Sequence, residues 1–297
     1  METSTMETLE PPMEPEIYVF PDKIVAFNLG SQKWVTLEVD QIREVSWNKR
    51  SFEYLVIDNE SKELVQALVT NQIARQQGND MIERKGNGLI ILLEGAPGAG
   101  KTFTAESVAE MAERPLYRVT GGDIGTKPEN AEKSLEGILY LSKIWGCVVL
   151  LDEAEMFLEQ RRTTDFKRNA LVSVFFRNLE YYEGIVILTL SRVAAFDEAF
   201  KSRIRLSLHY EYLNQGQRWK NFLNHLKTMK LAKIEMNGRQ IRNAITTARQ
   251  LAKFKNQRMD YNHLKHVIKA SEKFDKYLTS VREAVTDDQL AREEGFW

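Results

Sequence analysis

The segment IILLEGAPGAGKTFTAESVAE, residues 90–110, decides how the rest of the chain is interpreted. It opens with an aliphatic run typical of a buried strand, passes through a glycine-rich turn and ends in a run of good helix formers. The turn, GAPGAGKT at residues 95–102, fits the spacing G-x-x-x-x-G-K-[ST]. This spacing indicates a phosphate-binding loop when a strand precedes it and a helix follows it. Both conditions are met here.

Each part of this loop has a physical role. Its glycines let the backbone approach phosphate groups closely, and the N–H groups at the helix start attract negative charge. Lys101 would reach the terminal phosphates, and the hydroxyl of Thr102 would ligate Mg²⁺. The alternative is a glycine-rich turn with an exposed lysine. The residues predicted to bind the nucleotide are Gly95, Ala96, Pro97, Gly98, Ala99, Gly100, Lys101, Thr102 and Phe103.

A second motif, CVVLLDEAE at residues 147–155, supplies two adjacent carboxylates at the end of an apolar run. We expect Asp152 to hold the metal directly or through water. Glu153 follows at the position where a catalytic base would face the γ-phosphate. Lys101 together with Asp152 predicts a nucleoside triphosphatase site, and Glu153 favours hydrolysis over binding alone. The alternative is that both carboxylates are solvated residues at a strand end.

The pattern along the chain predicts an α/β fold with a parallel sheet. Between residues 88 and 213, short apolar runs alternate with helical stretches, as in βαβ units, and after residue 213 only helical periodicity remains. The five runs are LIILLEG, LYRVTG, CVVLLDE, GIVILTL and IRLSLHY. The predicted divisions are a disordered tail at 1–16, a strand-rich module at 17–60, a connector helix at 61–87, the ATPase core at 88–213, a helical lid at 214–280 and a polar tail at 281–297.

Composition excludes several classes of protein. The 297 residues include 41 basic and 42 acidic side chains, so bulk charge gives no argument for binding nucleic acid or an anionic membrane. A single cysteine, Cys147, excludes an internal disulfide, and its apolar surroundings predict an inert buried thiol. No apolar run approaches 18 residues, and the acidic start of the chain does not resemble a signal peptide. We expect a soluble intracellular protein, cytoplasmic by default.

The adjacent Asp and Glu, followed by a separate helical domain, favour the AAA+ class, and no N-K-x-D signature of a GTPase is found at a suitable strand end. The sequence resembles a group of fungal AAA ATPases over residues 27–270. This resemblance implies a three-layer P-loop core that binds ATP and Mg²⁺, with a helical lid. It also implies a ring, usually a homo-hexamer. The segments that carry it are GLIILLEGAPGAGKTFTAESVAE, LYRVTGGDIG, LLDEAEMFLEQRR, LVSVFFRNLEYYEGIVILT, FDEAFKSRIRLSLHY and NGRQIRNAITTARQLA.

The resemblance also assigns roles to single residues. The family usually has Asn at the end of the strand after the acidic motif, where it orients water, but LTLSR places Ser191 there. A serine hydroxyl is shorter and has one donor where an amide has two. Arg203 aligns with the arginine finger that a neighbouring subunit inserts, and Arg205 is a second cationic candidate. Arg239 matches a lid arginine near the phosphates, while Arg242 could instead pair with an acidic side chain on the surface.

A further departure concerns the connection GGDIGTKPENAEKSL at residues 121–135. Many AAA+ unfoldases carry an aromatic-hydrophobic-glycine loop at this place, which grips a polypeptide in the central pore. Here the connection is polar, and Ile124 is its only large apolar residue before Leu135. The sequence therefore gives no support for threading by aromatic side chains.

Two functions follow from these observations. The first is a Mg²⁺-dependent ATPase whose cycle remodels a protein partner. The second is a nucleotide-gated assembly module that binds ATP and hydrolyses it slowly because Ser191 replaces the amide. A nucleic-acid motor is a weaker third idea, because the basic loops carry no interleaved aromatic side chains that could stack on bases.

Overall fold

The computed structural model describes residues 21–77, 88–125, 128–158, 166–191, 198–212, 214, 234–273 and 277. The five predicted apolar runs all form strands, and they pair in parallel in one sheet of order β4-β5-β6-β3-β7. The α/β prediction is therefore confirmed. The strands are β3 (Leu89–Gly95), β4 (Leu116–Thr120), β5 (Val148–Asp152), β6 (Ile185–Leu190) and β7 (Leu206–Tyr210).

The strand order brings the two sequence motifs to one edge of the sheet. The phosphate-binding loop follows β3 and the carboxylate pair ends β5, and β6 lies between these two strands. Leu188 of β6 is in register with Leu92 on one side and Leu151 on the other. Because carboxyl ends of parallel strands lie along the same edge, the residues after β3, β5 and β6 face a common space.

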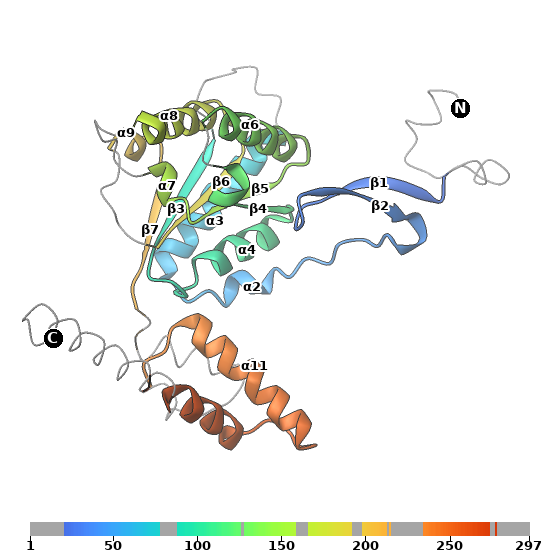
Figure 1. Ribbon diagram of the computed structural model, residues 1–297, viewed down its shortest axis with the longest axis vertical. Helices are drawn as coiled ribbons and strands as arrows, with labels where there is room; N and C mark the ends of the chain where they lie inside the picture. The colour runs from blue at the N-terminus through green and yellow to red at the C-terminus, as the bar shows by residue number, and fades with distance from the viewer. Residues whose placement is uncertain are drawn as a thin grey trace, which may run out of the picture.

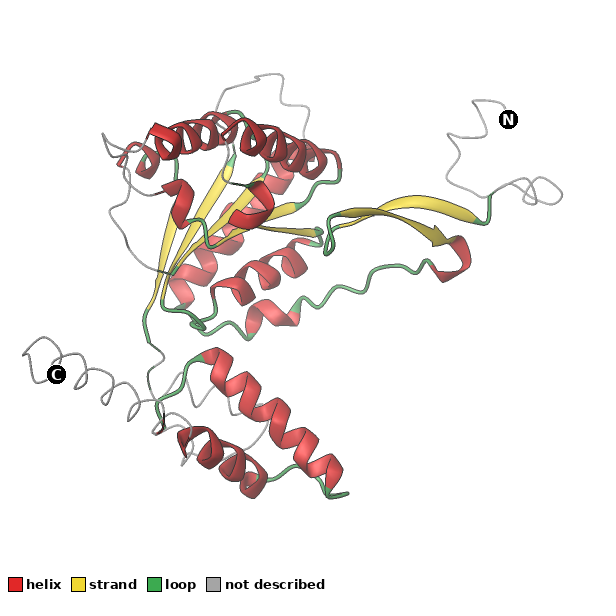
Figure 2. Ribbon diagram, in the orientation of Figure 1, coloured by secondary structure: helices red, strands yellow, loops and turns green. Residues whose placement is uncertain are grey.

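Helices cover both faces of the sheet (Figures 1 and 2). Alternate residues of β3 belong to opposite cores, as the pleat of a strand requires. Ile90 and Leu92 pack with α6 (Pro128–Ile144) and α8 (Phe166–Glu180). Ile91 packs with α3 (Asn59–Gln77) and α4 (Lys101–Ala112) on the other face. The shorter helices are η2 (Val39–Gln41), α2 (Arg50–Glu53), α5 (Gly121–Ile124), α7 (Glu155–Leu158) and α9 (Glu198–Lys201).

A two-stranded antiparallel hairpin, β1 (Lys23–Asn28) and β2 (Lys33–Glu38), projects from the core (Figure 1). The side chain of Asn28 accepts hydrogen bonds from the N–H groups of Gly30 and Ser31, which stabilises the tight turn between the two strands. After the hairpin, residues 42–48 are neither helix nor strand. Most side chains of the hairpin are exposed, so between residues 21 and 60 the strands build no core of their own.

Aromatic rings attach the hairpin to the sheet and to α6. The ring of Phe27 lies 5.3 Å from Trp34, 6.0 Å from Tyr117 on β4 and 5.5 Å from Trp145, measured between ring centroids. The rings of Trp34 and Trp145 are 6.2 Å apart. Offset and edge-to-face contacts at such distances are favourable beyond the area they bury. The hairpin is therefore held at its turn end while its strands extend outward.

After β7, the described chain is helical and has its own apolar cluster, which agrees with the predicted lid. Helix α11 (Gly238–Phe254) is capped by Asn237, whose side chain accepts a hydrogen bond from the N–H of Gln240 in a capping box. Residues 261–273 form a second helix. The buried apolar side chains shared by the two helices are Ile241, Ala244, Ile245, Ala248, Leu264 and Ile268.

Several sequence predictions fall outside the described residues. These are the tails at 1–16 and 281–297, the end of the connector at 78–87, and 215–233 within the predicted lid. The predicted domain boundaries therefore stay predictions. Within the described residues, no helix is both long and apolar enough to cross a membrane.

Candidate functional site

The backbone of the loop after β3 requires glycine at two positions for lack of space. Gly95 and Gly98 have positive φ angles of 141° and 78°. A side-chain carbon at Gly95 would lie 2.3 Å from the carbonyl oxygen of Tyr210, and one at Gly98 would lie 2.7 Å from the side-chain oxygen of Asn237. β7 therefore packs against the beginning of the loop, and the lid packs against its middle.

Lys101 is buried and folds back over this loop. Its Nζ donates hydrogen bonds to the carbonyl oxygens of Gly95, at 2.6 Å, and Ala96, at 3.0 Å. Burial lowers the pKa of Lys101, and the carboxylates of Asp152 and Glu155 act against that effect. The ammonium group thus lies at the centre of the loop, where a phosphate would meet it.

The start of α4 is suited to an anion. Its N-cap residue is Gly100, which has no side chain to accept hydrogen bonds from the first turn. Uncapped N–H groups and the positive end of the helix dipole favour negative charge at this place. Ala99 is half-buried, and the ring of Phe103 in the first turn of α4 is 44% exposed.

Asp152 is buried at the end of β5 and is held by donors from three directions. The hydroxyl of Thr189 on β6 donates to Oδ1 at 2.6 Å, and the guanidinium of Arg118 on β4 donates to Oδ2 at 2.6 Å. The hydroxyl of Thr102 lies 3.5 Å from Oδ1 and 3.4 Å from Oδ2. A carboxylate beside a hydroxyl is the type of oxygen-ligand pair that Mg²⁺ prefers, so these residues fit the ion.

Glu153 differs from its neighbour in both conformation and exposure. Its φ of 57° lies in the left-handed region, which is uncommon for a residue with a side chain. Its N–H donates to the hydroxyl of Thr189 at 2.9 Å, and its side chain is exposed whereas that of Asp152 is buried. Strained backbone of this kind is often found at functional sites. The sharp turn after β5 therefore separates the buried carboxylate predicted to hold the metal from the exposed carboxylate predicted to act as the base.

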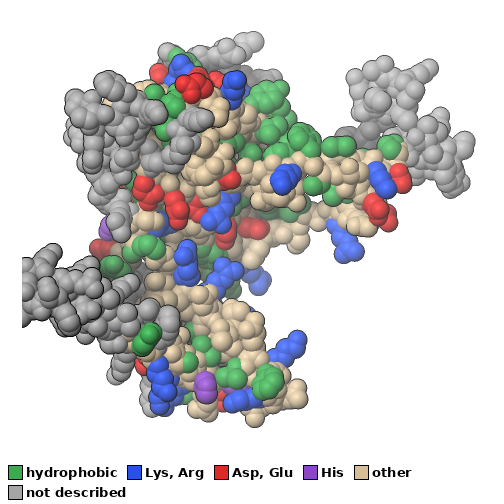
Figure 3. Space-filling view, in the orientation of Figure 1, with side chains coloured by type: hydrophobic (Ala, Val, Ile, Leu, Met, Phe, Trp, Pro, Cys, Tyr) green, Lys and Arg blue, Asp and Glu red, His purple; other side chains and the backbone are tan. Residues whose placement is uncertain are grey.

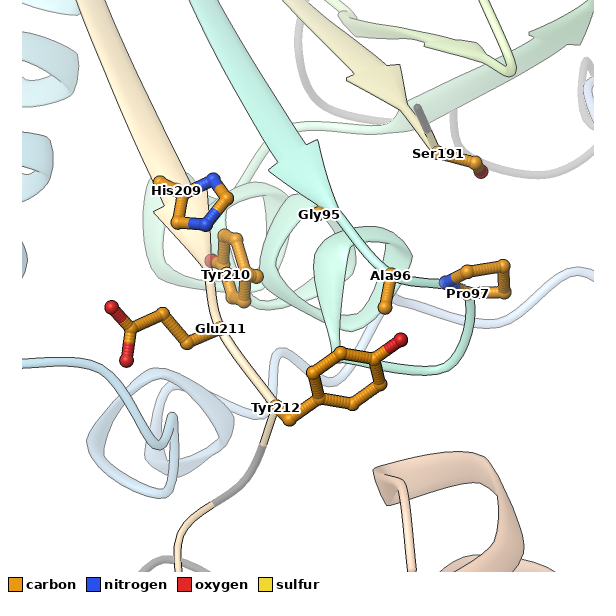
Figure 4. Close-up of a pocket in the computed structure, with 8 residues that line it drawn as sticks. All are labelled: Gly95, Ala96, Pro97, Ser191, His209, Tyr210, Glu211 and Tyr212. Atoms are coloured by element: carbon orange, nitrogen blue, oxygen red, sulfur yellow. The ribbon is translucent and has the colours of Figure 1, made fainter. Parts of the chain in front are cut away.

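Ser191 follows β6 and lines a cavity of about 620 Å³ beside the loop, a volume within the range of ligand pockets. Its N–H donates to the side chain of Glu155 at 2.5 Å. Figure 4 shows that the cavity is built from the ends of β3, β6 and β7. Its lining residues are Gly95, Ala96, Pro97, Ser191, His209, Tyr210, Glu211 and Tyr212.

The lid reaches the loop through the start of α11. The N–H of Arg239 donates to the carbonyl oxygen of Gly98 at 3.3 Å. The positive charge of Arg239 contributes to lowering the pKa of Lys101, so its charge acts on the site. Arg242 lies on the same helix and is also exposed. Acidic and basic side chains gather where the sheet domain faces the lid (Figure 3).

Arg203, between α9 and β7, is directed to α8 of its own chain. Its guanidinium lies 3.4 Å from the carboxylate of Glu180 and 5.6 Å from the centre of the Phe176 ring. Arg205 immediately precedes β7. Its N–H donates to the carbonyl oxygen of Ile90, and its side chain is exposed. In this structure of one chain, neither arginine is among the residues that line the cavity at the loop.

Sequence reasoning did not identify four residues of this site. Thr189 had a usable signal, because it is a polar residue within a run of buried aliphatic residues. Arg118 and Glu155 had none, because charged residues are common at exposed positions of a strand and in the first turn of a helix. Tyr210 of β7 contacts α4, the helix that follows the loop. Its hydroxyl lies 2.6 Å from that of Thr104, and burial raises the pKa of Tyr210 to about 12.

The structure also describes part of the connection where a pore loop would lie. Ile124 is 2% exposed and packs in the core with α6. Thus the large apolar residue in this connection is committed to the interior, and residues 126 and 127 lie outside the described chain.

Comparison with known proteins matches two families. Residues 91–212 match the ATPase family associated with various cellular activities (AAA), and residues 206–285 match the fungal AAA+ ATPase lid domain. The first match contains the loop, the carboxylate pair, Ser191 and Arg203. The second contains Arg239. Both matches agree with the fold and with the division between sheet and helical regions seen here.

Individual relatives are distant and match only in part. ATPase family AAA domain-containing protein 3B of Homo sapiens is 28% identical over 149 residues, 46% of this chain and 22% of that protein. Lon protease of Mycolicibacterium smegmatis is 28% identical over 110 residues, 32% of this chain and 14% of its own length. The outer mitochondrial transmembrane helix translocase of Danio rerio is 26% identical over 137 residues, 43% and 36% of the two chains. The match thus spans less than two fifths of each relative.

Proposed function

Because the chain belongs to the AAA family of ATPases, we propose that it binds ATP with Mg²⁺ and hydrolyses it as a subunit of a ring. In this proposal, the cycle remodels a protein partner. The observation that carries it is the arrangement around Asp152. The hydroxyl of Thr102 and that of Thr189, near the end of β6, both lie beside this one carboxylate. Lys101 lies in the adjoining loop.

The residues divide the chemistry among them. Lys101, the start of α4 and Arg239 would bind the phosphates. Thr102 and Asp152 would hold Mg²⁺, which supplies charge neutralisation at the phosphates when it is bound. Glu153, exposed beside that site, would accept the proton of the attacking water.

The ring is proposed on account of Arg203. Its guanidinium contacts Glu180 and Phe176 on α8 of its own chain, and it does not line the cavity at the loop. In a ring, Arg203 of one subunit would act as the arginine finger that completes the nucleotide site of the neighbouring subunit. In related phosphoryl-transfer enzymes such a cation is worth about 10³ to 10⁵ in rate. Turnover should therefore depend on assembly.

Ser191 supports a second candidate function. The side chain at this position has one hydroxyl donor, and the backbone N–H is already bonded to Glu155. With weak orientation of water, the chain would act as a nucleotide-gated assembly module that binds ATP and hydrolyses it slowly. This candidate and the first share the binding site and differ in rate.

The experiment is Mg²⁺-dependent phosphate release from ATP, measured across a series of protein concentrations. Glu153→Gln is the blank, because the amide keeps the shape of the side chain but accepts no proton. We expect a specific rate that rises with concentration and falls to background in the variant. If the protein binds ATP but its rate of phosphate release is no higher than that of the blank at every concentration, the ring ATPase is rejected and the assembly module is favoured. Failure to bind ATP would reject both.

Ser191→Asn tests the second candidate directly. We expect turnover to increase while nucleotide affinity stays within about twofold, because the change adds a donor for water and leaves the loop intact. An unchanged rate would show that Ser191 is not the reason for slow hydrolysis.

A further inference from the structure

The ion pair between Arg118 and Asp152 joins the proposed metal site to the edge strand of the sheet. Arg118 lies on β4, two residues before the position that is in register with Asp152. Its guanidinium donates to Oδ2 at 2.6 Å. The side chain of Asp152 is 9% exposed, whereas that of Arg118 is 55% exposed. The carboxylate is thus fixed inside, while its cation lies at the surface.

Arg118 is the cation in direct contact with this carboxylate. Thr189 and Thr102 contribute neutral hydroxyls, and the ammonium of Lys101 acts on Asp152 through space while bonded to its own loop. A buried carboxylate is costly unless it is paired or hydrogen-bonded. In the absence of metal, therefore, Arg118 compensates the charge of Asp152.

A divalent cation at Thr102 and Asp152 would compete with the guanidinium of Arg118 for the carboxylate of Asp152. Two positive groups at one carboxylate repel each other, and the half-exposed guanidinium has solvent into which it can move. On this basis we propose that Arg118 is an internal counterion which Mg²⁺ must displace from Asp152, so that this arginine sets the Mg²⁺ concentration at which nucleotide is held. The inference rests on the proposed function, because it assumes that nucleotide and Mg²⁺ bind here.

The backbone of Arg118 is fixed independently of its side chain. The side-chain amide of Gln32, in the hairpin turn, donates to the carbonyl oxygen of Arg118 at 3.2 Å. The neighbouring Tyr117 belongs to the aromatic cluster with Phe27. The strand can therefore stay in place while the guanidinium leaves, which makes the competition a matter of one side chain.

The test is a titration of Mg²⁺ from an EDTA-buffered solution, with binding of a fluorescent ADP analogue as the readout, so that turnover is not needed. Arg118→Gln removes the charge and keeps a polar side chain. Arg118→Lys keeps the charge. Arg177→Gln is the matched control, because the side chain of Arg177 is 60% exposed, close to the 55% of Arg118, and it pairs with Glu132 between α8 and α6 instead of with Asp152.

We expect Arg118→Gln to lower the midpoint Mg²⁺ concentration by about three- to tenfold, the range for losing a partly exposed, charge-assisted pair. Arg118→Lys and Arg177→Gln should stay within about twofold of the parent. The rise in melting temperature caused by Mg²⁺ and ADP should also be larger in Arg118→Gln, since its metal-free form lacks the counterion.

An unchanged midpoint in Arg118→Gln, with the parent binding nucleotide normally, would overturn the counterion while leaving the proposed function standing. A higher midpoint would also overturn it, because it would mean that Arg118 positions the carboxylate for the metal. If the parent protein binds no nucleotide at any Mg²⁺ concentration, the proposed function fails and the inference falls with it.

Discussion

Replacing Thr189 by Val should destabilise the protein more than the same replacement of Thr104, another buried threonine of the sheet domain. Thr189 is 1% exposed and its Oγ1 makes two hydrogen bonds, to Oδ1 of Asp152 at 2.6 Å and from the N–H of Glu153 at 2.9 Å. Valine has nearly the same shape but cannot make either bond. The change therefore leaves a buried carboxylate and a neighbouring N–H without this partner.

The size of the effect follows from the two bonds. A hydrogen bond to a charged group contributes about 1.5 to 3 kcal/mol, and one between neutral groups about 0.5 to 1.5 kcal/mol. We expect the free energy of unfolding to fall by about 2 to 4 kcal/mol. Urea denaturation followed by circular dichroism measures this value directly.

Thr104→Val is the matched control, because Thr104 is also buried but its hydroxyl contacts only the carbonyl oxygen of Gly100 and the phenol of Tyr210. These two uncharged bonds predict a loss of about 1 to 3 kcal/mol. Thr189→Ser, which keeps the hydroxyl, should lose less than Thr189→Val. If Thr189→Val costs no more than Thr104→Val, then the bond to Asp152 adds nothing beyond a neutral contact, and the reasoning is refuted.

Two further predictions concern a glycine and the cysteine. Gly98→Ala should weaken binding of a fluorescent ADP analogue at least tenfold, because the new carbon would lie 2.7 Å from Asn237 at a positive φ. Gly137→Ala in α6 is the control, because its new carbon would meet open space. It should leave binding unchanged and stabilise the helix by about 0.5 to 1 kcal/mol. Equal binding by both variants would contradict the contact between loop and lid. Burial raises the pKa of Cys147 to about 11, so at pH 8 about one thiol in a thousand is ionised. The native protein should therefore react with a chromogenic thiol reagent far more slowly than the urea-unfolded chain, which absorbance measures. Equal rates would mean that Cys147 is accessible.

The sequence predicted the parts of the site that depend on spacing along the chain. The loop at residues 95–102 and the pair Asp152 and Glu153 each lie within one strand-turn unit, so their geometry follows from local rules. The strands β3, β5 and β6 were also predictable, because parallel strands buried on both faces read as continuous apolar runs. The edge strands β4 and β7 have polar residues at exposed positions but still form short apolar-rich runs. These features need no knowledge of which strands are neighbours.

The remaining contacts depend on strand order, which no local pattern contains. Arg118 reaches Asp152 only because β4 lies next to β5, and Thr189 does so only because β6 lies between β5 and β3. Likewise, the approach of Asn237 to Gly98 depends on how the lid folds back. The pairing of β1 with β2 is local and follows from the turn between them, whereas the attachment of this hairpin to the sheet through Phe27 and Tyr117 is not contained in any local pattern.

The place where the hairpin turn meets β4 has a consequence for solubility. β4 is an edge strand, with β5 on one side only. Its Tyr117 and Val119 are in register with Val149 and Leu151 of β5, while the carbonyl oxygen of Arg118 is bonded to the side chain of Gln32 from the hairpin. An edge that offers open backbone groups invites strands from other molecules. Because the hairpin occupies this acceptor and packs Phe27 against Tyr117, we expect it to disfavour edge-to-edge pairing of β4 with strands of other molecules.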